Sequence, residues 1–82
     1  MSYYVYMLKS QGKKSLTYVG YTKNIKHRIA LHNSGKGAKF TKGRTWKLIY
    51  KEIFNSKSKA ISREYYIKKN RTLRNKIKNK YI

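Results

Sequence analysis

The chain has 82 residues and contains neither cysteine nor proline, so we expect one small domain over residues 1–82 without disulfides or a cysteine-built zinc site. Its length argues against a multidomain enzyme. Lysine and arginine total 22 against only two acidic residues, which gives a formal net charge of +20. This excess indicates a polyanionic partner, above all a nucleic acid.

Membrane insertion and secretion are not expected. No segment approaches the roughly 18 apolar residues that a membrane span requires, and the first residues lack the pattern of a signal peptide. The 39% hydrophobic and 15% aromatic content occurs in periodic groups, which indicates a folded domain. We therefore expect an intracellular protein, cytoplasmic or nucleoid-associated. The alternative, a basic protein on a membrane surface, would need one long amphipathic helix.

The N-terminal part predicts a β-hairpin. Residues 3–10 are aromatic and β-branched, which favours a buried strand. A polar segment with a glycine follows, and the strand pattern resumes over residues 16–22, so an antiparallel hairpin is expected. The two-residue period of strands then allows Tyr6 and Tyr18 to converge.

A helix follows the hairpin. Thr22 or Asn24 can cap it, and it runs to about Asn33, since isoleucines recur at i, i+4 and a glycine comes soon after. Arg28 and His32 also have i, i+4 spacing, which places them one turn apart on the same surface. They are candidates for phosphate contact, and a solvated helix face is the alternative.

A basic, glycine-rich segment over residues 34–45 is expected to be a loop, and residues 46–54 form a third predicted strand. The hydrophobic residues of that strand are expected to be largely core: Trp46, Leu48, Ile49, Tyr50, Ile53 and Phe54.

Two more helices are predicted in the C-terminal part. Ser56 or Ser58 caps the first, which reaches about Lys69, and the second covers about residues 72–81. Along the first of them Glu64 shares one stripe with an alanine and an isoleucine. An acidic side chain among apolar neighbours is costly unless it has a role or a partner.

The two carboxylates limit the possible phosphodiester chemistry. Mg²⁺ is typically held by one or two carboxylates together with water and substrate phosphate, and Glu52 and Glu64 are too few for a two-metal site. The sequence therefore predicts one metal or none. Glu64 is the candidate ligand because Glu52 is expected to point outward from its strand. A salt bridge from Glu64 to a nearby lysine or arginine is the alternative.

Tyrosine can act as a general base only if its pKa falls from about 10, and a dense positive field with a metal nearby is one way to lower it. The charge of this chain offers such a field. The alternative is that Tyr6 and Tyr18 form an ordinary cross-strand pair in the core, as most tyrosines do.

Taken in order, these motifs resemble a GIY-YIG nuclease domain, in particular the small stand-alone members and the catalytic subunit of structure-specific junction endonucleases. The resemblance covers about residues 3–70 and includes the loop at 33–41. It is carried by Tyr4-Val5-Tyr6, Tyr18-Val19-Gly20, Arg28, His32 and Glu64.

The resemblance implies an α+β fold in which a three-stranded antiparallel sheet is flanked by helices. It also implies hydrolysis of DNA by a single-metal mechanism that leaves a 5′-phosphate and a 3′-hydroxyl. Gly20 would let the backbone pass close to the helix. The predicted order of strands and helices agrees with this fold.

The resemblance also implies the roles of the site residues. Tyr6 and Tyr18 would be the paired motif tyrosines, one of which activates or orients the attacking water. Arg28 would hold the scissile phosphate. His32 would hydrogen-bond near the nucleophile or phosphate and assist in removing a tyrosine proton, and Glu64 would bind one Mg²⁺ or Mn²⁺ ion.

DNA binding is expected to rest mainly on phosphate contacts, without strong sequence specificity, and to weaken as salt rises. Single-stranded, flapped or branched DNA is the expected substrate, with or without a protein partner that selects it; the oligomeric state is left open. The expected contacts come from the loop and the basic C-terminal helices, the last at about 70–82: Lys39, Thr41, Lys68, Lys69, Arg71, Arg74 and Lys76.

Three alternatives stay open at this level. The basic C-terminal residues can be a solvated tail. The chain can be a non-catalytic nucleic-acid-binding module, such as a ribosome- or nucleoid-associated protein. It can also be a nuclease that acts on RNA.

Overall fold

The computed structural model of the chain describes residues 2–12 and 14–81. Three strands form one antiparallel sheet in the order β2-β1-β3, and the described helices include none long and apolar enough to cross a bilayer. The elements are β1 (Tyr3–Ser10), β2 (Thr17–Thr22), α1 (Ile25–Asn33), β3 (Trp46–Phe54), α2 (Lys57–Lys69) and α3 (Arg71–Tyr81). The predicted α+β class and the order of the elements are confirmed, while Lys13 of the predicted turn and residue 82 lie outside the described residues.

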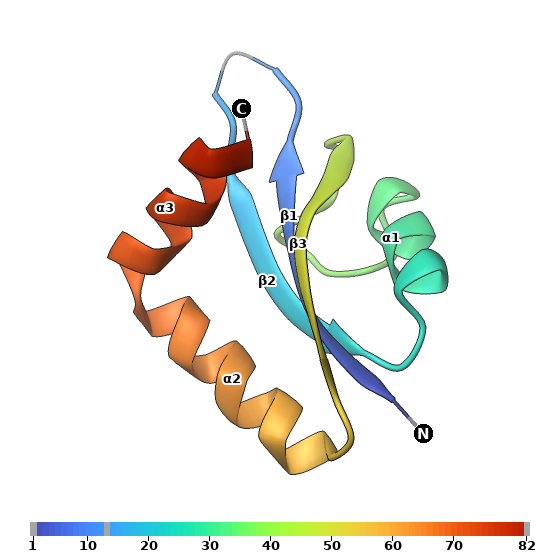
Figure 1. Cartoon of the computed structure of the whole chain (residues 1–82). Coiled ribbons are helices and arrows are strands. Elements are labelled where there is room, and N and C mark those ends of the chain that lie inside the picture. The colour runs from blue at the N-terminus through green and yellow to red at the C-terminus, as the bar shows by residue number, and fades with distance from the viewer. Residues whose placement is uncertain (1, 13, 82) are drawn as a thin grey trace.

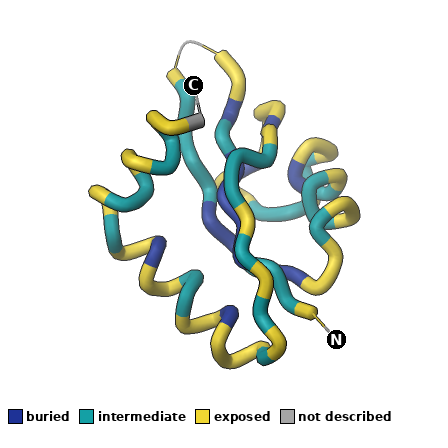
Figure 2. Tube along the Cα trace, viewed as in Figure 1, coloured by how far each residue is buried: buried dark blue, intermediate teal, exposed yellow. Residues whose placement is uncertain are grey.

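The helices cover the sheet from both faces. Helix α1 lies against one face, and α2 and α3 lie against the other (Figure 1). The core is accordingly divided in two. Val5 and Met7 of β1 pack against Ala60 and Ile67 of α2, whereas the alternate β1 residues Tyr6 and Leu8 pack with Trp46 on the α1 side. The central strand contains the longest run of buried residues in the tube of Figure 2.

The helix caps follow the predicted chemistry and decide between the alternatives. The side chain of Asn24 accepts a hydrogen bond from the backbone N–H of His27 at 3.0 Å, and that of Ser56 accepts one from Lys59. Each satisfies an N–H that the helix itself leaves unpaired. Thr22 instead accepts from the backbone N–H of Asn24 at 3.2 Å, just before the helix.

A β-bulge in β3 was not predicted. Met7 and Leu8 are consecutive on β1, but their partners on β3 are Tyr50 and Leu48, so Ile49 is an extra residue. A bulge of this kind lets two successive side chains lie on the same face and shifts the alternation beyond it. Ile49 and Tyr50 accordingly both pack toward the α2 and α3 side.

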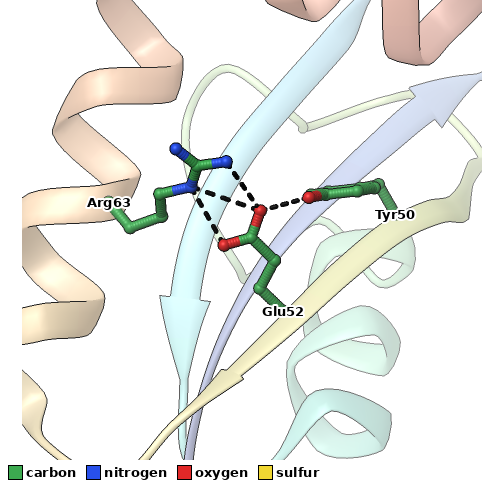
Figure 3. A network of polar contacts seen from close by, with 3 residues as sticks. All are labelled: Tyr50, Glu52 and Arg63. Atoms are coloured by element: carbon green, nitrogen blue, oxygen red, sulfur yellow. Dashed lines mark hydrogen bonds and ion pairs between the residues drawn. The ribbon is translucent and has the colours of Figure 1, made fainter.

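This shift corrects two predictions for β3. Ile53, expected in the core, is 61% exposed. Glu52, expected to point outward, lies on the face covered by α2 and forms an ion pair with Arg63, whose Nε lies 2.9 Å from its Oε1. Figure 3 shows Arg63 and the hydroxyl of Tyr50 converging on the Glu52 carboxylate. One of the two acidic residues is therefore committed to holding α2 on the sheet.

Candidate active site

A buried hydrogen-bonded chain links β1, α1 and the loop that precedes β3. The hydroxyl of Tyr6 lies 2.8 Å from Nε2 of His32, and Nδ1 of His32 lies 2.9 Å from the hydroxyl of Thr41. The Thr41 hydroxyl also donates to the carbonyl of Ala38 at 3.0 Å. Both His32 and Thr41 are 0% exposed. The loop therefore fixes the imidazole through its Nδ1 atom, and the Tyr6 hydroxyl contacts its Nε2 atom.

The direction of these hydrogen bonds follows from the proton count. A threonine hydroxyl has one proton, and that of Thr41 is given to Ala38. Its oxygen must therefore accept from Nδ1–H of His32, which leaves Nε2 of a neutral imidazole as an acceptor. The O–H of Tyr6 then donates to Nε2. The structure thus aims a phenolic proton at an unprotonated imidazole nitrogen.

Two glycines leave space for the hydrogen-bonded side chains of Tyr6 and His32. A Cβ on Gly20, which pairs with Tyr6 across the strands, would lie 2.6 Å from the Tyr6 hydroxyl oxygen. A Cβ on Gly37 would lie 2.4 Å from Nδ1 of His32. Neither approach is possible for a larger residue without displacement. The role expected for Gly20, passage of the backbone close to a helix, is corrected: the nearest atoms belong to the rings of Tyr6 and Tyr18.

The other predicted catalytic residues share a pocket with Tyr6. The ring centroid of Tyr18 lies 6.4 Å from that of Tyr6, in agreement with the convergence that the strand period predicted. It also lies 4.8 Å from that of His32. Arg28 extends from α1 and Glu64 from α2. The pocket has a volume of about 440 Å³ and is lined by Tyr3, Tyr6, Tyr18, Gly20, Tyr21, Thr22, Lys23, Arg28, Lys57 and Glu64.

Arg28 and Glu64 give this pocket charges of opposite sign. The guanidinium of Arg28 forms no hydrogen bond or ion pair with another residue of the described chain, so its donors are available to a ligand. The side chain of Glu64 is 17% exposed and lies 3.6 Å from Nζ of Lys68, one turn further along α2. That lysine is half exposed, and such a surface pair is weak, so a stronger ligand can displace it.

The local environment affects both members of the Tyr6–His32 pair. Burial, with a smaller contribution from Tyr18, raises the pKa of Tyr6, and Arg28 opposes this shift. Burial and the positive charge of Arg28 lower the pKa of His32. The protein charge alone therefore does not give the lowered tyrosine pKa that a free phenolate base would need. Both shifts favour the neutral form of the group, so the contact is a hydrogen bond between neutral partners and not an ion pair.

Residues that could hold a metal ion reduce to one carboxylate. Within residues 2–12 and 14–81, no three side chains of the His, Cys, Asp and Glu types gather as a ligand cluster. Glu52 is bound to Arg63, and both nitrogens of His32 are occupied. A single carboxylate facing an open pocket suits Mg²⁺ or Mn²⁺, which retain water and take further oxygen ligands from a phosphate.

The predicted nucleic-acid contacts fall into distinct groups. Lys68 lies beside the pocket, with its Nζ 6.0 Å from the ring centroid of Tyr18. Thr41 is buried against His32, so its side chain supports the site from within. Arg74 donates to the carbonyls of Ile67 and Lys68 and thereby caps the C-terminal end of α2. These last two side chains have structural partners in place of a phosphate.

The remaining predicted contacts lie on the surface. Lys39, Lys69 and Arg71 are exposed, and Nζ of Lys69 lies 4.6 Å from the ring centroid of Tyr65. Lys76 lines a separate depression between α3 and β3. The structure does not bring this group into the pocket of Tyr6 and Glu64.

Two cationic residues of the pocket were missed by the sequence reasoning. Lys23 follows β2 directly, and Lys57 is the first residue of α2. Lys57 precedes Glu64 by seven residues, which is two helical turns, so the helical period already placed both on one side of α2. The position of Lys23 depends on how β2 leads into α1, which the spacing of residues does not show.

Known proteins resemble this chain in sequence and in fold. The sequence model described as the GIY-YIG catalytic domain matches residues 2–81. A UPF0213 protein of Staphylococcus haemolyticus is 54% identical over 67 residues, which is 80% of this chain and 79% of that protein. A UPF0213 protein of Bacillus licheniformis is 45% identical over 82 residues, 99% of this chain and 79% of that protein. The solution NMR structure of a UPF0213 protein from Bacillus halodurans matches with a TM-score of 0.54 and 37% identity, over 96% of this chain and 84% of that one.

Proposed function

Because the chain belongs to the GIY-YIG catalytic domain family, we propose that it is a metal-dependent endonuclease that hydrolyses phosphodiester bonds in DNA. The observation that supports this most strongly is the hydrogen bond from Tyr6 to His32 at the wall of a pocket that also holds Arg28 and Glu64. A proton acceptor, a cation and a carboxylate at one site are what phosphodiester hydrolysis requires.

Tyr6 and His32 handle the proton of the attacking water. The Tyr6 hydroxyl oxygen accepts a proton from water as its own proton passes to Nε2 of His32. This transfer needs no stable phenolate, so the raised pKa of Tyr6 is compatible with it. Thr41 keeps Nδ1 protonated and Nε2 free to receive the proton. Tyr6 is thus the tyrosine whose proton His32 is proposed to accept.

Arg28 binds the scissile phosphate and stabilises the charge that builds up on it. A guanidinium can donate two parallel hydrogen bonds to phosphate oxygens. The ring of Tyr18 forms the adjacent wall, and Lys23 and Lys57 add positive charge at the rim. These residues orient the substrate so that the phosphorus faces the water held by Tyr6.

Glu64 is the residue that would hold the divalent cation, Mg²⁺ or Mn²⁺, with water and phosphate oxygens as the remaining ligands. When bound, the cation supplies Lewis-acid neutralisation of the phosphate and helps the leaving oxygen. Lys68 exchanges its contact with Glu64 for one with the substrate.

The substrate is expected to be recognised through its backbone. Lys23 and Lys57 line the pocket and Lys68 lies next to Glu64. Cations placed around the cleavage pocket favour contacts with phosphates, which carry no sequence information directly. We therefore propose that DNA structure, not sequence, selects the site of cleavage.

The test is cleavage of end-labelled DNA of one sequence in single-stranded, duplex, flapped and four-way form, with Mg²⁺, Mn²⁺ or EDTA, and with the same strand as RNA. Cleavage in the presence of metal that leaves 5′-phosphate ends supports the proposal. Tight binding without cleavage of any substrate contradicts it and favours the binding module, and cleavage confined to RNA contradicts the assignment to DNA.

A further inference from the structure

Phe40 is an exposed aromatic residue next to the site. The residue is 54% exposed although its side chain has no polar atom. Its ring is stacked on that of Tyr18, at a centroid distance of 6.1 Å and an angle of 25°, and its centroid lies 6.1 Å from that of Trp46. One side of the ring is thus supported by aromatic neighbours, and more than half of the residue faces solvent.

The backbone holds Phe40 in place. The next residue, Thr41, is fully buried, and both its N–H and its hydroxyl donate to the carbonyl of Ala38. The Thr41 carbonyl accepts a hydrogen bond from the indole of Trp46 at 2.8 Å. A loop anchored in this way keeps the exposed ring ordered before any ligand binds, which lowers the entropic cost of binding.

The position of Phe40 indicates what it binds. Tyr18, on which Phe40 stacks, is itself part of the pocket lining. The exposed Lys39 precedes Phe40 in the chain, and Lys68 lies beside the ring of Tyr18. Aromatic rings between cations that track a backbone are typical of surfaces for unpaired nucleic acid, since every base has a face that can stack. A base inside a duplex is already stacked and would have to be displaced first.

We infer that Phe40 is a platform on which an unpaired base next to the scissile phosphate stacks, so that the substrate is DNA that is single-stranded or locally unpaired at the cut. This inference rests on the proposed function, because the scissile phosphate is placed by Arg28 and Glu64. It assigns to one side chain the choice between unpaired and duplex DNA.

The chain offers a matched control. Tyr66 is 52% exposed, but it lies on another side of α2, where it lines a depression with Phe54 and Arg63. Loss of that ring removes a similar aromatic surface and does not touch the pocket. Phe40→Tyr is the conservative variant, because it keeps the ring and adds only a hydroxyl at an exposed position.

The experiment measures affinity by fluorescence anisotropy in a Glu64→Gln background, so that no strand is cut, for single-stranded and duplex forms of one oligonucleotide. Phe40→Ala is expected to weaken single-strand binding about 5- to 150-fold, the range for stacking one base, and to leave duplex binding unchanged. Phe40→Tyr and Tyr66→Ala are expected to bind like the parent. An abasic nucleotide at one position should reproduce the loss in the parent and add nothing in Phe40→Ala.

The inference would be overturned if Phe40→Ala lost affinity equally for both forms of DNA, or lost none. It would also be overturned if no abasic position showed coupling to Phe40. The cleavage assay on protein with Glu64 intact separates this from the proposed function. Coupling to an unpaired base without any cleavage supports the platform and contradicts the nuclease. Cleavage of duplex at the single-strand rate, unchanged in Phe40→Ala, supports the nuclease and overturns the platform.

Discussion

The hydroxyl of Tyr6 lies 2.8 Å from Nε2 of His32, although 26 residues separate them in the chain. The contact exists because β1 is the central strand and α1 packs beside it, so that a side chain from each meets at the pocket. Thr41 fixes the opposite nitrogen of the imidazole. Proton transfer in the proposed reaction depends on this pair.

Thr41→Val is expected to impair proton transfer between Tyr6 and His32 without changing either residue. It keeps the size of the side chain but removes the acceptor for Nδ1–H, so the tautomer of His32 is no longer fixed. We expect at least about a tenfold lower kcat and about 1–3 kcal/mol less stability, from an unpaired buried donor. Thr41→Ser keeps the hydroxyl and should retain most of both. The comparison uses single-turnover cleavage and urea denaturation; wild-type kcat in Thr41→Val would contradict the positioning role.

Gly20→Ala is expected to displace Tyr6. The added Cβ would lie 2.6 Å from the phenolic oxygen, and the ring of Tyr6 is too deeply buried to move without cost. We expect about 1–3 kcal/mol less stability, and about a 100-fold loss of cleavage if the ring shifts by about 1 Å. Chemical denaturation and cleavage rates measure the two effects. A variant that cuts at the wild-type rate would show that the ring need not be held where the structure places it.

His32 should make stability depend on pH. Its pKa is lowered in the folded protein by burial and by Arg28, so the folded state favours the neutral ring. Above the unfolded pKa of about 6.5 both states are neutral and stability is full, whereas at lower pH only the unfolded chain binds the proton readily, and stability falls. Urea denaturation at about pH 7.5 and about pH 5.5 should show this loss in wild type and in His27→Gln, and a smaller one in His32→Gln. An equal loss in all three proteins would contradict it.

Two lysines on α2 test the path of the DNA. Lys57 lines the pocket, whereas Lys59, two residues on, lies in the depression on another side of the helix. Lys57→Gln should weaken binding of single-stranded DNA and reduce the slope of log affinity against log salt by about 0.7, the value for one phosphate contact. Lys59→Gln should leave the slope unchanged. If the two variants lose the same affinity and slope, the positive charge of α2 attracts DNA without a preferred side of the helix, which contradicts the proposed path.

The sequence was sufficient for the elements and for the meeting of Tyr6 and Tyr18, because the period of a strand and the chemistry of helix caps are local properties. The bulge at Ile49 could not be predicted, since an extra β-branched residue fits a strand pattern as well as a paired one. That one residue reversed the expected positions of Glu52 and Ile53.

The supporting residues of the site were harder to predict than its catalytic candidates. Thr41 was assigned to the nucleic-acid surface because it lies in a basic loop, but burial against His32 is a tertiary property that composition does not reveal. Phe40, its neighbour, drew no prediction of its own, although it carries the exposed ring. Lys57 could have been found from its seven-residue spacing to Glu64.

The two acidic residues provide the most direct test of the central claim. Glu52 is held by Arg63 and Tyr50. Burial opposes ionisation of Glu52, but the hydrogen bonds from Arg63 and Tyr50 outweigh this effect and lower its pKa. Glu64 instead faces the pocket, with the exposed Lys68 beside it. Glu52→Gln should lose about 1 kcal/mol of stability, a fall of about 4–8 °C in Tm, and still cut DNA.

The decisive measurement is therefore metal-dependent cleavage and Tm of Glu64→Gln beside Glu52→Gln. If Glu64 holds the cation, Glu64→Gln keeps a Tm close to that of wild type and loses cleavage, while its binding of DNA persists. Wild-type cleavage by Glu64→Gln would contradict the account, because no other carboxylate lines the pocket among the described residues.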